Sequence, residues 1–197
     1  MNKVLLVMVS LTTSFILINS AIVLYVPTQV RAQSNNINNF QQYQNSKFGI
    51  KIQHPSDWTV AENKNYSVDN TEVVNFSSPV SEDVVVSVDT VNNINSTTPT
   101  TTTTALKQYV NDSIISDLKT SPSFKLLESN ANSTLGGNPA YSITYNNKDQ
   151  NGPYKGMDIV TIKDGKAYDI SYTADPDRYA SVLPTVQTMI NSFGLLK

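Results

Sequence analysis

The sequence predicts an α+β domain in which helices cover an antiparallel sheet. Short runs of alternating apolar and polar residues, separated by turns rich in glycine, proline and asparagine, are typical of antiparallel strands. Two stretches repeat apolar residues at helical spacing, one in the middle of the chain and one at its end. Strands and helices do not alternate as they do in parallel sheets. With 197 residues, the chain is long enough for one domain with a sizeable core.

Residues 1–32 stand apart from this domain. No charged side chain occurs from Val4 to Val26, and Lys3 precedes the run. We expect residues 1–32 to be either a signal peptide, cleaved between Ala32 and Gln33, or a retained membrane anchor. Because the positive charge should stay inside, both alternatives place the rest of the chain outside the cytoplasm. The protein is then secreted or tethered to the outer face of the cytoplasmic membrane by residues 4–26.

A polar tether and a first strand are expected next. Residues 33–42 are rich in asparagine and glutamine, which favours a flexible tether, so the domain is predicted to span residues 43–197. In the stretch FGIKIQHPSDW, the side chains of Phe48, Ile50 and Ile52 alternate onto one face. Pro55 is expected to end this strand because it has no backbone donor.

The middle of the chain predicts two strands, a loop and a helix. Thr71–Phe76 and Val84–Val91 are rich in valine and flank a Ser-Ser-Pro turn. Residues 92–104 contain a threonine tract with one proline, which predicts an exposed loop. A helix is expected from Thr104 to Lys119, where four apolar residues repeat every four positions: Leu106, Val110, Ile114 and Leu118.

The last third predicts two hairpins and a closing helix. Strands are expected at Phe124–Glu128 and Pro139–Asn146, around a turn at residues 136–139. Met157–Ala174 reads as a hairpin turning at Asp164-Gly165, with Met157, Ile159 and Thr161 opposite Tyr172, Ile170 and Tyr168. The final helix is expected to begin with Asp175 as N-cap and Pro176 as first helical residue, and Pro184 should kink it. Its apolar stripe consists of Tyr179, Val182, Leu183, Val186, Ile190 and Phe193.

Composition excludes several classes of protein. The chain has no cysteine, so it holds no disulfide, lipid-modified cysteine or thiolate metal site. Without residues 1–32, 12 basic residues remain against 16 acidic ones and no basic cluster occurs, which disfavours nucleic acid as a partner. Five Asn-x-Ser/Thr sequences are candidate glycosylation sites in an exported protein, namely Asn65, Asn75, Asn95, Asn111 and Asn132.

Catalytic chemistry finds little support in the sequence. His54 is the only histidine, and no serine lies in a Gly-x-Ser-x-Gly elbow. A lone histidine at a strand end is more often structural than catalytic, so we predict no catalytic residues and no cofactor site.

One loop has the spacing of a calcium site. Asn147, Asp149 and Asn151 occupy alternate positions before Gly152, and Asp158 falls at position twelve, as in calcium-binding loops. Asn147 lacks the usual charge, however, Asp158 is shorter than glutamate, and strands instead of helices flank the loop. A polar hairpin loop is the simpler interpretation, and calcium binding is kept as an alternative.

The order of these stretches resembles the PsbP family, extrinsic proteins of the photosystem II oxygen-evolving complex and their standalone relatives. The resemblance rests on residues 48–58, LGGNPAYSITY, VTIKDGKAYDISYTA and the closing helix through MINSFGL. It is greatest to exported single-domain versions found in archaea. It implies an α/β/α sandwich around a central antiparallel sheet, similar to a Ran-binding group, with a long C-terminal helix. It also implies that residues 49–58 are a structural signature and that His54 occupies a variable position.

For function, the resemblance implies a non-enzymatic protein that binds a membrane complex and influences retention of calcium, chloride and manganese. Photosynthetic members dock through basic surface residues, which this acidic domain lacks. We therefore expect an extracytoplasmic domain that binds or supports an unidentified membrane or cell-surface protein complex. Two alternatives are a calcium- or other metal-binding module and an exported hydrolase whose site the sequence does not reveal.

Overall fold

The computed structural model describes residues 39–67, 71–91 and 102–196. The predicted signal peptide or anchor, most of the tether and most of the threonine-rich loop lie outside these residues, as does Asn95. Within the described part of the chain, no helix is both long and apolar enough to cross a membrane.

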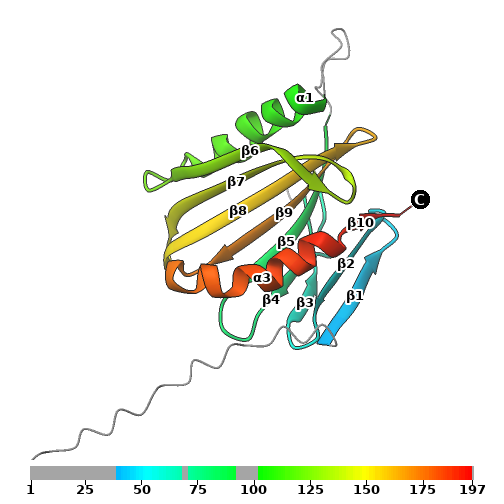
Figure 1. Ribbon diagram of the computed structural model, residues 1–197, viewed down its shortest axis with the longest axis horizontal. Helices are drawn as coiled ribbons and strands as arrows, with labels where there is room; N and C mark the ends of the chain where they lie inside the picture. The colour runs from blue at the N-terminus through cyan, green and yellow to red at the C-terminus, as the bar shows by residue number, and fades with distance from the viewer. Residues whose placement is uncertain (1–38, 68–70, 92–101, 197) are drawn as a thin grey trace, which may run out of the picture. The chain divides into compact units, whose positions relative to one another are not determined.

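Within these residues the structure has two antiparallel sheets and four helical segments, three of which follow one another directly in the chain (Figure 1). The larger sheet has seven strands in the order β3-β4-β5-β9-β8-β7-β6, and the smaller has three in the order β1-β2-β10. The strands are β1 Phe40–Asn45, β2 Ile50–Pro55, β3 Thr59–Glu62, β4 Glu72–Ser77, β5 Asp83–Thr90, β6 Lys125–Leu135, β7 Asn138–Asp149, β8 Gly152–Lys163, β9 Lys166–Ala174 and β10 Gly194–Leu195. The helical segments are α1 Thr102–Tyr109, η2 Val110–Ile115, α2 Ser116–Leu118 and α3 Pro176–Ser192.

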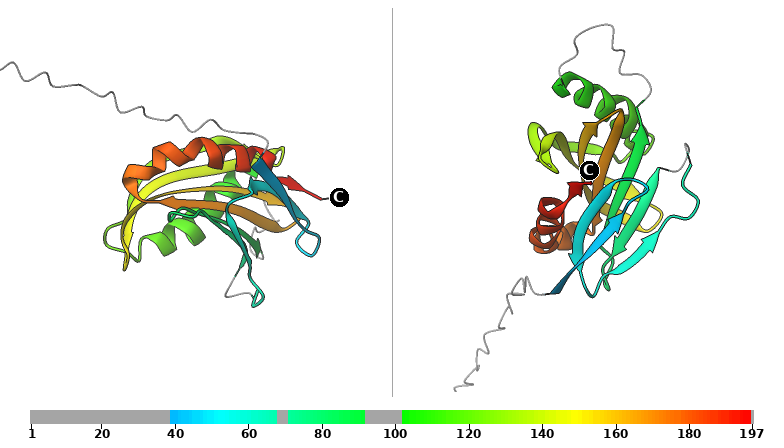
Figure 2. Two further views of the ribbon diagram at one scale, coloured as in Figure 1. Left: turned by 90° about the horizontal axis from the view of Figure 1, so that it is seen from below. Right: turned by 90° about the vertical axis from the view of Figure 1, so that its right-hand side faces the viewer.

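Helices cover both faces of the seven-stranded sheet, as Figure 2 shows with α3 on one side and α1 on the other. The face toward α3 and the small sheet carries the larger apolar cluster, which includes Phe76, Ile170, Tyr172 and Met189. The opposite face packs a smaller cluster against α1 and η2. The predicted α+β sandwich with a central antiparallel sheet and a long C-terminal helix is therefore confirmed.

The stretch at residues 48–58 lies inside the larger core. Ile50 and Ile52 are fully buried from β2 while Lys51 and Gln53 point outward, and the strand ends at Pro55 as predicted. Trp58 is 9% exposed and belongs to the same cluster. Gly49 precedes the strand at φ 68°, a conformation that favours glycine, and its carbonyl accepts a hydrogen bond from the N–H of Leu196.

The hairpin formed by β8 and β9 has the predicted turn and register. Met157 pairs with Tyr172, Ile159 with Ile170, and Thr161 with Tyr168. Asp164 and Gly165 form the turn with φ of 51° and 73°, so both central residues are left-handed, as a two-residue hairpin turn requires.

Helix α3 begins at Pro176 with Asp175 in the N-cap position, as predicted. The Asp175 side chain makes no capping bond; its carbonyl instead accepts from the N–H groups of Arg178 and Tyr179. Met189, which the predicted stripe omitted, is fully buried.

Several boundaries differ from the sequence predictions. β1 begins at Phe40, inside the predicted tether, because its polar residues pair with β2 along the whole strand. α1 begins at Thr102, inside the predicted loop, and the predicted helix contains a π-helical segment, η2. β6 and β7 extend well beyond their predicted ends through polar residues that ladder bonds hold in place. The three strands β1, β3 and β10 were not predicted.

Candidate functional site

The residues of the predicted calcium loop do not converge. β7 continues to Asp149 and β8 starts at Gly152, so the loop is a tight turn. Asn147 pairs with Tyr154 in the ladder, whereas Asp158 pairs with Ile143. At about 3.3 Å per residue, Asp158 lies roughly 20 Å along β8 from Gly152. Calcium ligands must lie within about 2.6 Å of the ion, so these four residues do not form the calcium site that the sequence left open as an alternative.

The polar side chains of this loop have structural partners. Asp149 Oδ1 accepts hydrogen bonds from the backbone N–H groups of Asn151 and Gly152, at 2.7 and 3.1 Å. Asn147 Oδ1 accepts from the hydroxyl of Ser123 at 3.1 Å and from the N–H of Lys148. These bonds fix the turn and attach it to the segment before β6, which supports the simpler interpretation of a polar hairpin loop.

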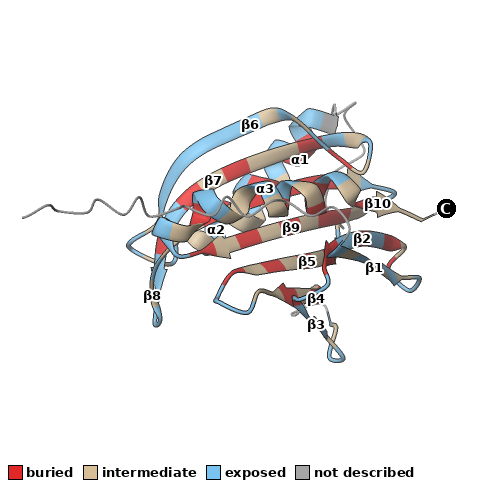
Figure 3. Ribbon diagram, turned by 60° about the horizontal axis from the view of Figure 1, so that its bottom comes forward, coloured by how far each residue is buried: buried red, intermediate tan, exposed pale blue. Residues whose placement is uncertain are grey.

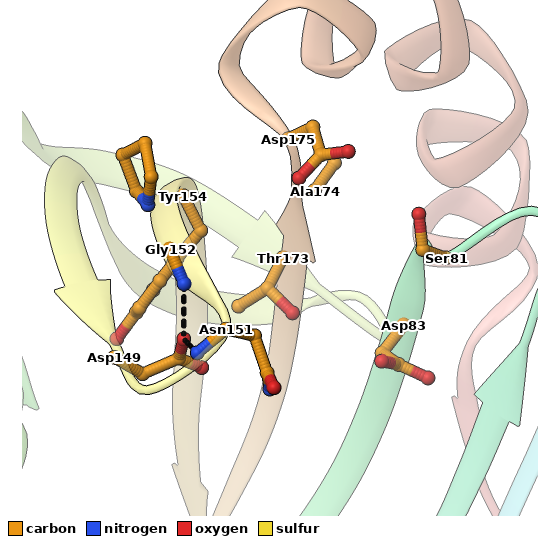
Figure 4. A pocket seen from close by; sticks show the side chains of 10 residues that line it. Ser81, Asp83, Asp149, Asn151, Gly152, Tyr154, Thr173, Ala174 and Asp175 are labelled. Atoms are coloured by element: carbon orange, nitrogen blue, oxygen red, sulfur yellow. Dashed lines mark hydrogen bonds between the residues drawn. The ribbon is translucent and has the colours of Figure 1, made fainter.

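A cavity of about 420 Å³ lies beside this turn (Figure 4). Three carboxylates from separate elements line it, those of Asp83 on β5, Asp149 and Asp175, together with Ser81 and Thr173. Asp149 already holds the turn, and Asp83 accepts a hydrogen bond from the hydroxyl of Ser77 at 2.6 Å. Two of the three carboxylates therefore already serve the local structure, and an acidic cluster does not by itself define a site.

A second cavity, of about 390 Å³, lies between the seven-stranded sheet and the segment α1-η2-α2. We call it the polar cavity. Its carboxylates are Asp89, Asp117, Asp158 and Asp169, and its other lining residues are Thr71, Ser87, Tyr109, Ser113, Ile114, Leu118 and Ala167. The sheet residues come from β5, β8 and β9, on the face of the sheet that α1 and η2 cover.

Two carboxyls of the polar cavity are incompletely paired. Asp158 is 4% exposed, and the side chains of Ser171 and Tyr145 hydrogen-bond to it. Its Oδ2 and the Oδ1 of Asp169 are buried without a hydrogen-bond partner among the described residues. A buried polar oxygen without a partner costs about 1–3 kcal/mol, so these atoms need an explanation.

Burial also alters the charge of these two groups. Loss of water raises the pKa of Asp158 to about 6, against the hydrogen bonds from Ser171 and Tyr145 that lower it. Burial, and then the negative charge of Asp158, raise the pKa of Asp169 well above its usual range. The cause is desolvation of two adjacent carboxyls, which makes full ionisation of both unfavourable near neutral pH.

His54 occupies a structural environment. Its side chain is 5% exposed and stacks on the ring of Phe76, with 5.0 Å between the ring centroids. Its Nδ1 lies 2.8 Å from the carbonyl oxygen of Pro55. The alternation of β2 places it on the inward face with Ile50 and Ile52, where it packs in the core.

The candidate glycosylation sites differ in access. Asn65, Asn111 and Asn132 are exposed, whereas Asn75 is half-buried within β4. Occupancy of these sites stays a prediction.

Comparison with known proteins gives the family. A family model described as PsbP matches residues 38–195, nearly all of the described part of the chain. The chain belongs to the PsbP family. No curated protein sequence shows a significant match to it.

Solved structures agree on the fold of this PsbP-family chain. Cyanobacterial PsbP (CyanoP) from Synechocystis sp. PCC 6803 is 20% identical with a TM-score of 0.59, and the match covers 82% of this chain and 95% of that one. LpqN, involved in cell envelope biogenesis of Mycobacterium tuberculosis, is 13% identical with a TM-score of 0.54, covering 82% and 94%. A mutant of the protein Mog1 is 12% identical with a TM-score of 0.54, covering 81% and 97%.

Of the four carboxylates of the polar cavity, the sequence analysis singled out only that of Asp158, and assigned it to a different site. Asp169 lies between Tyr168 and Ile170, so the alternation indicated only that it faces away from the core side. A polar face is normally solvated. Nothing in the sequence showed that α1 and η2 cover it.

Proposed function

We propose that the protein is a non-enzymatic PsbP-family domain that works outside the cytoplasm by binding or supporting a membrane or cell-surface protein complex. The family match over residues 38–195 carries this proposal. The uncharged run Val4–Val26 supports the location, and the structural role of His54 supports the absence of hydrolytic catalysis. The resemblance to exported archaeal versions stays a prediction.

Contacts with other proteins require surface that the fold leaves available. β6 forms one edge of the seven-stranded sheet, and Figure 3 shows most of its length exposed. Leu126 and Leu127 on this strand are 41% and 40% exposed. At the opposite edge, β3 carries Val60, which is 38% exposed. These positions are suitable for mapping contacts because substitution there disturbs little packing.

In-cell crosslinking tests the proposal. A photo-reactive amino acid is placed at Leu127 on one edge and at Val60 on the other, and captured proteins are identified by mass spectrometry. We expect one edge to capture the same membrane or envelope protein reproducibly while the other serves as the control. The proposal would be contradicted if both positions captured the same non-specific set of proteins and the protein migrated as a monomer in native gel electrophoresis.

A catalytic alternative is tested separately. A panel of esterase, glycosidase and peptidase substrates should give only background rates with the purified protein. Activity that copurifies with the protein and disappears in a single-residue variant would overturn the non-enzymatic assignment.

A further inference from the structure

The polar cavity has the lining of a cation site. Four carboxylates and the hydroxyls of Thr71, Ser87, Tyr109 and Ser113 surround it, and its lining contains no lysine, arginine or histidine. Tyr109 donates to Asp89 Oδ2 at 3.2 Å. No lining residue offers Asp158 or Asp169 a positive charge. Buried carboxylates are normally paired with a cation, so a ligand that supplies positive charge would complete the site.

The unpaired oxygens give the second observation. Asp158 is more than nine-tenths buried, lines the cavity, and keeps Oδ2 without a hydrogen-bond donor among the described residues. Asp169 is half-buried as a residue, but its Oδ1 is buried and also has no hydrogen-bond donor among these residues. The two residues lie on adjacent strands, since Asp158 pairs with Ser171 and Asp169 with Val160. They are thus diagonal neighbours on one face of the sheet, within reach of a single donor group.

The wall opposite these carboxyls is irregular. Ser113 and Ile114 line the cavity from η2, the π-helical part of the helix. Such segments occur frequently at functional sites because the extra residue redirects side chains and backbone. Here η2 places a hydroxyl and an apolar side chain over the sheet carboxyls, and Leu118 and Ala167 add apolar surface.

The size and ligand set favour an organic cation over a metal ion. A volume of about 390 Å³ far exceeds the roughly 30 Å³ that one water molecule occupies in the liquid. Among the described residues, no three acidic, histidine or cysteine side chains are grouped closely enough to hold a metal ion. An ammonium group needs only hydrogen-bond acceptors around it, and a carbon chain attached to it can contact Ile114, Leu118 and Ala167.

We propose that the polar cavity binds a small aliphatic amine, whose ammonium group donates hydrogen bonds to Asp158 Oδ2 and Asp169 Oδ1. The other two carboxyls of the cavity, those of Asp89 and Asp117, attract a second ammonium group on the same ligand. This site does not depend on the proposed binding of a protein complex, because it lies beneath a helix and not at an exposed edge.

Titration calorimetry with putrescine on the purified full-length protein at pH 8 tests this inference. We expect saturable binding with one ligand per chain. Asp158→Asn and Asp169→Asn should each weaken binding by about tenfold or more, since a charged hydrogen bond contributes about 1.5–3 kcal/mol. Asp164→Asn is the matched control: it also removes one negative charge, and asparagine tolerates the φ of 51° at this turn.

The outcomes separate the alternatives. Circular dichroism confirms that each variant is folded before its affinity is compared. No saturable heat with putrescine, or equal binding by wild type, both cavity variants and Asp164→Asn, overturns the proposal. Binding of calcium at the same residues without binding of putrescine also overturns it, in favour of a metal site.

Discussion

Trp58 lies between the end of β2 and the start of β3, and its side chain contributes to stability because it is buried. It is 9% exposed and belongs to the larger core cluster. We expect Trp58→Ala to lower the free energy of unfolding by about 3–5 kcal/mol, because truncating a large buried aromatic leaves a cavity. Urea unfolding measures the change, and Thr59→Ala on the exposed neighbour is the control. An unchanged unfolding midpoint for Trp58→Ala would contradict the burial.

Asp158 makes stability depend on pH. Its pKa is raised from 3.8 to about 6 in the folded protein, chiefly by burial. Between these values the folded state holds more protons than the unfolded state, so stability falls as pH rises. Hydrogen bonds from Ser171 on β9 and Tyr145 on β7 oppose this rise in the pKa of Asp158. The other titratable groups that face the same cavity are Asp169 on β9, Asp89 on β5, Asp117 on α2 and Tyr109 on α1.

We therefore expect the free energy of unfolding to decrease from about pH 4 to pH 7. The Asp158 contribution is on the order of 3 kcal/mol, since each pKa unit corresponds to about 1.4 kcal/mol. Asp158→Asn should flatten this slope and raise stability at pH 8 relative to wild type, whereas Asp164→Asn should leave the slope unchanged. Thermal unfolding across this range measures it; a wild-type slope that persists in Asp158→Asn would show that other groups titrate.

At the scale of elements, helix α3 carries an internal proline. Pro184 is exposed and has no N–H, so the carbonyl four residues earlier loses its helical donor. We expect Pro184→Ala to raise the free energy of unfolding by about 1–3 kcal/mol. Pro176→Ala is the matched control, because proline at the first helical position costs nothing and the effect there should be small. Equal effects at both positions in chemical denaturation would contradict this explanation.

Strong local signals account for the elements that the sequence predicted well. The Asp164-Gly165 turn fixed the register of β8 and β9, and the stripe from Tyr179 to Phe193 identified α3. β3 and β10 were missed because they are short, and β1 because its polar residues gain their order only by pairing with β2. Pairing between segments distant in sequence has no local pattern, which also explains why the polar cavity was not predicted.

At the scale of the whole molecule, processing of the N-terminal segment determines whether the domain is released or stays attached to the membrane. Residues 1–32 are predicted to be a cleaved signal peptide or a retained anchor. Cleavage gives a mature protein that begins at Gln33, and N-terminal sequencing of protein recovered outside the cytoplasm measures this. An intact N-terminus in washed membrane fractions would instead establish the anchor, and recovery from the cytoplasm would contradict both.

In the small sheet, the first strand of the domain, β1, and the last, β10, both pair with the same central strand, β2. β1 pairs with β2 from Phe40↔Pro55 to Asn45↔Ile50, and β10 pairs with the same strand at Gly194↔Lys51 and Leu195↔Ile50. Both outer strands run antiparallel to β2, so the chain enters at one end of this sheet and leaves at the other. A force pulling the two ends apart would therefore slide β1 and β10 along β2, loading their hydrogen bonds together and not one after another. The small sheet therefore resists separation of the two ends of the domain in shear, because both outer strands are bonded to the same central strand.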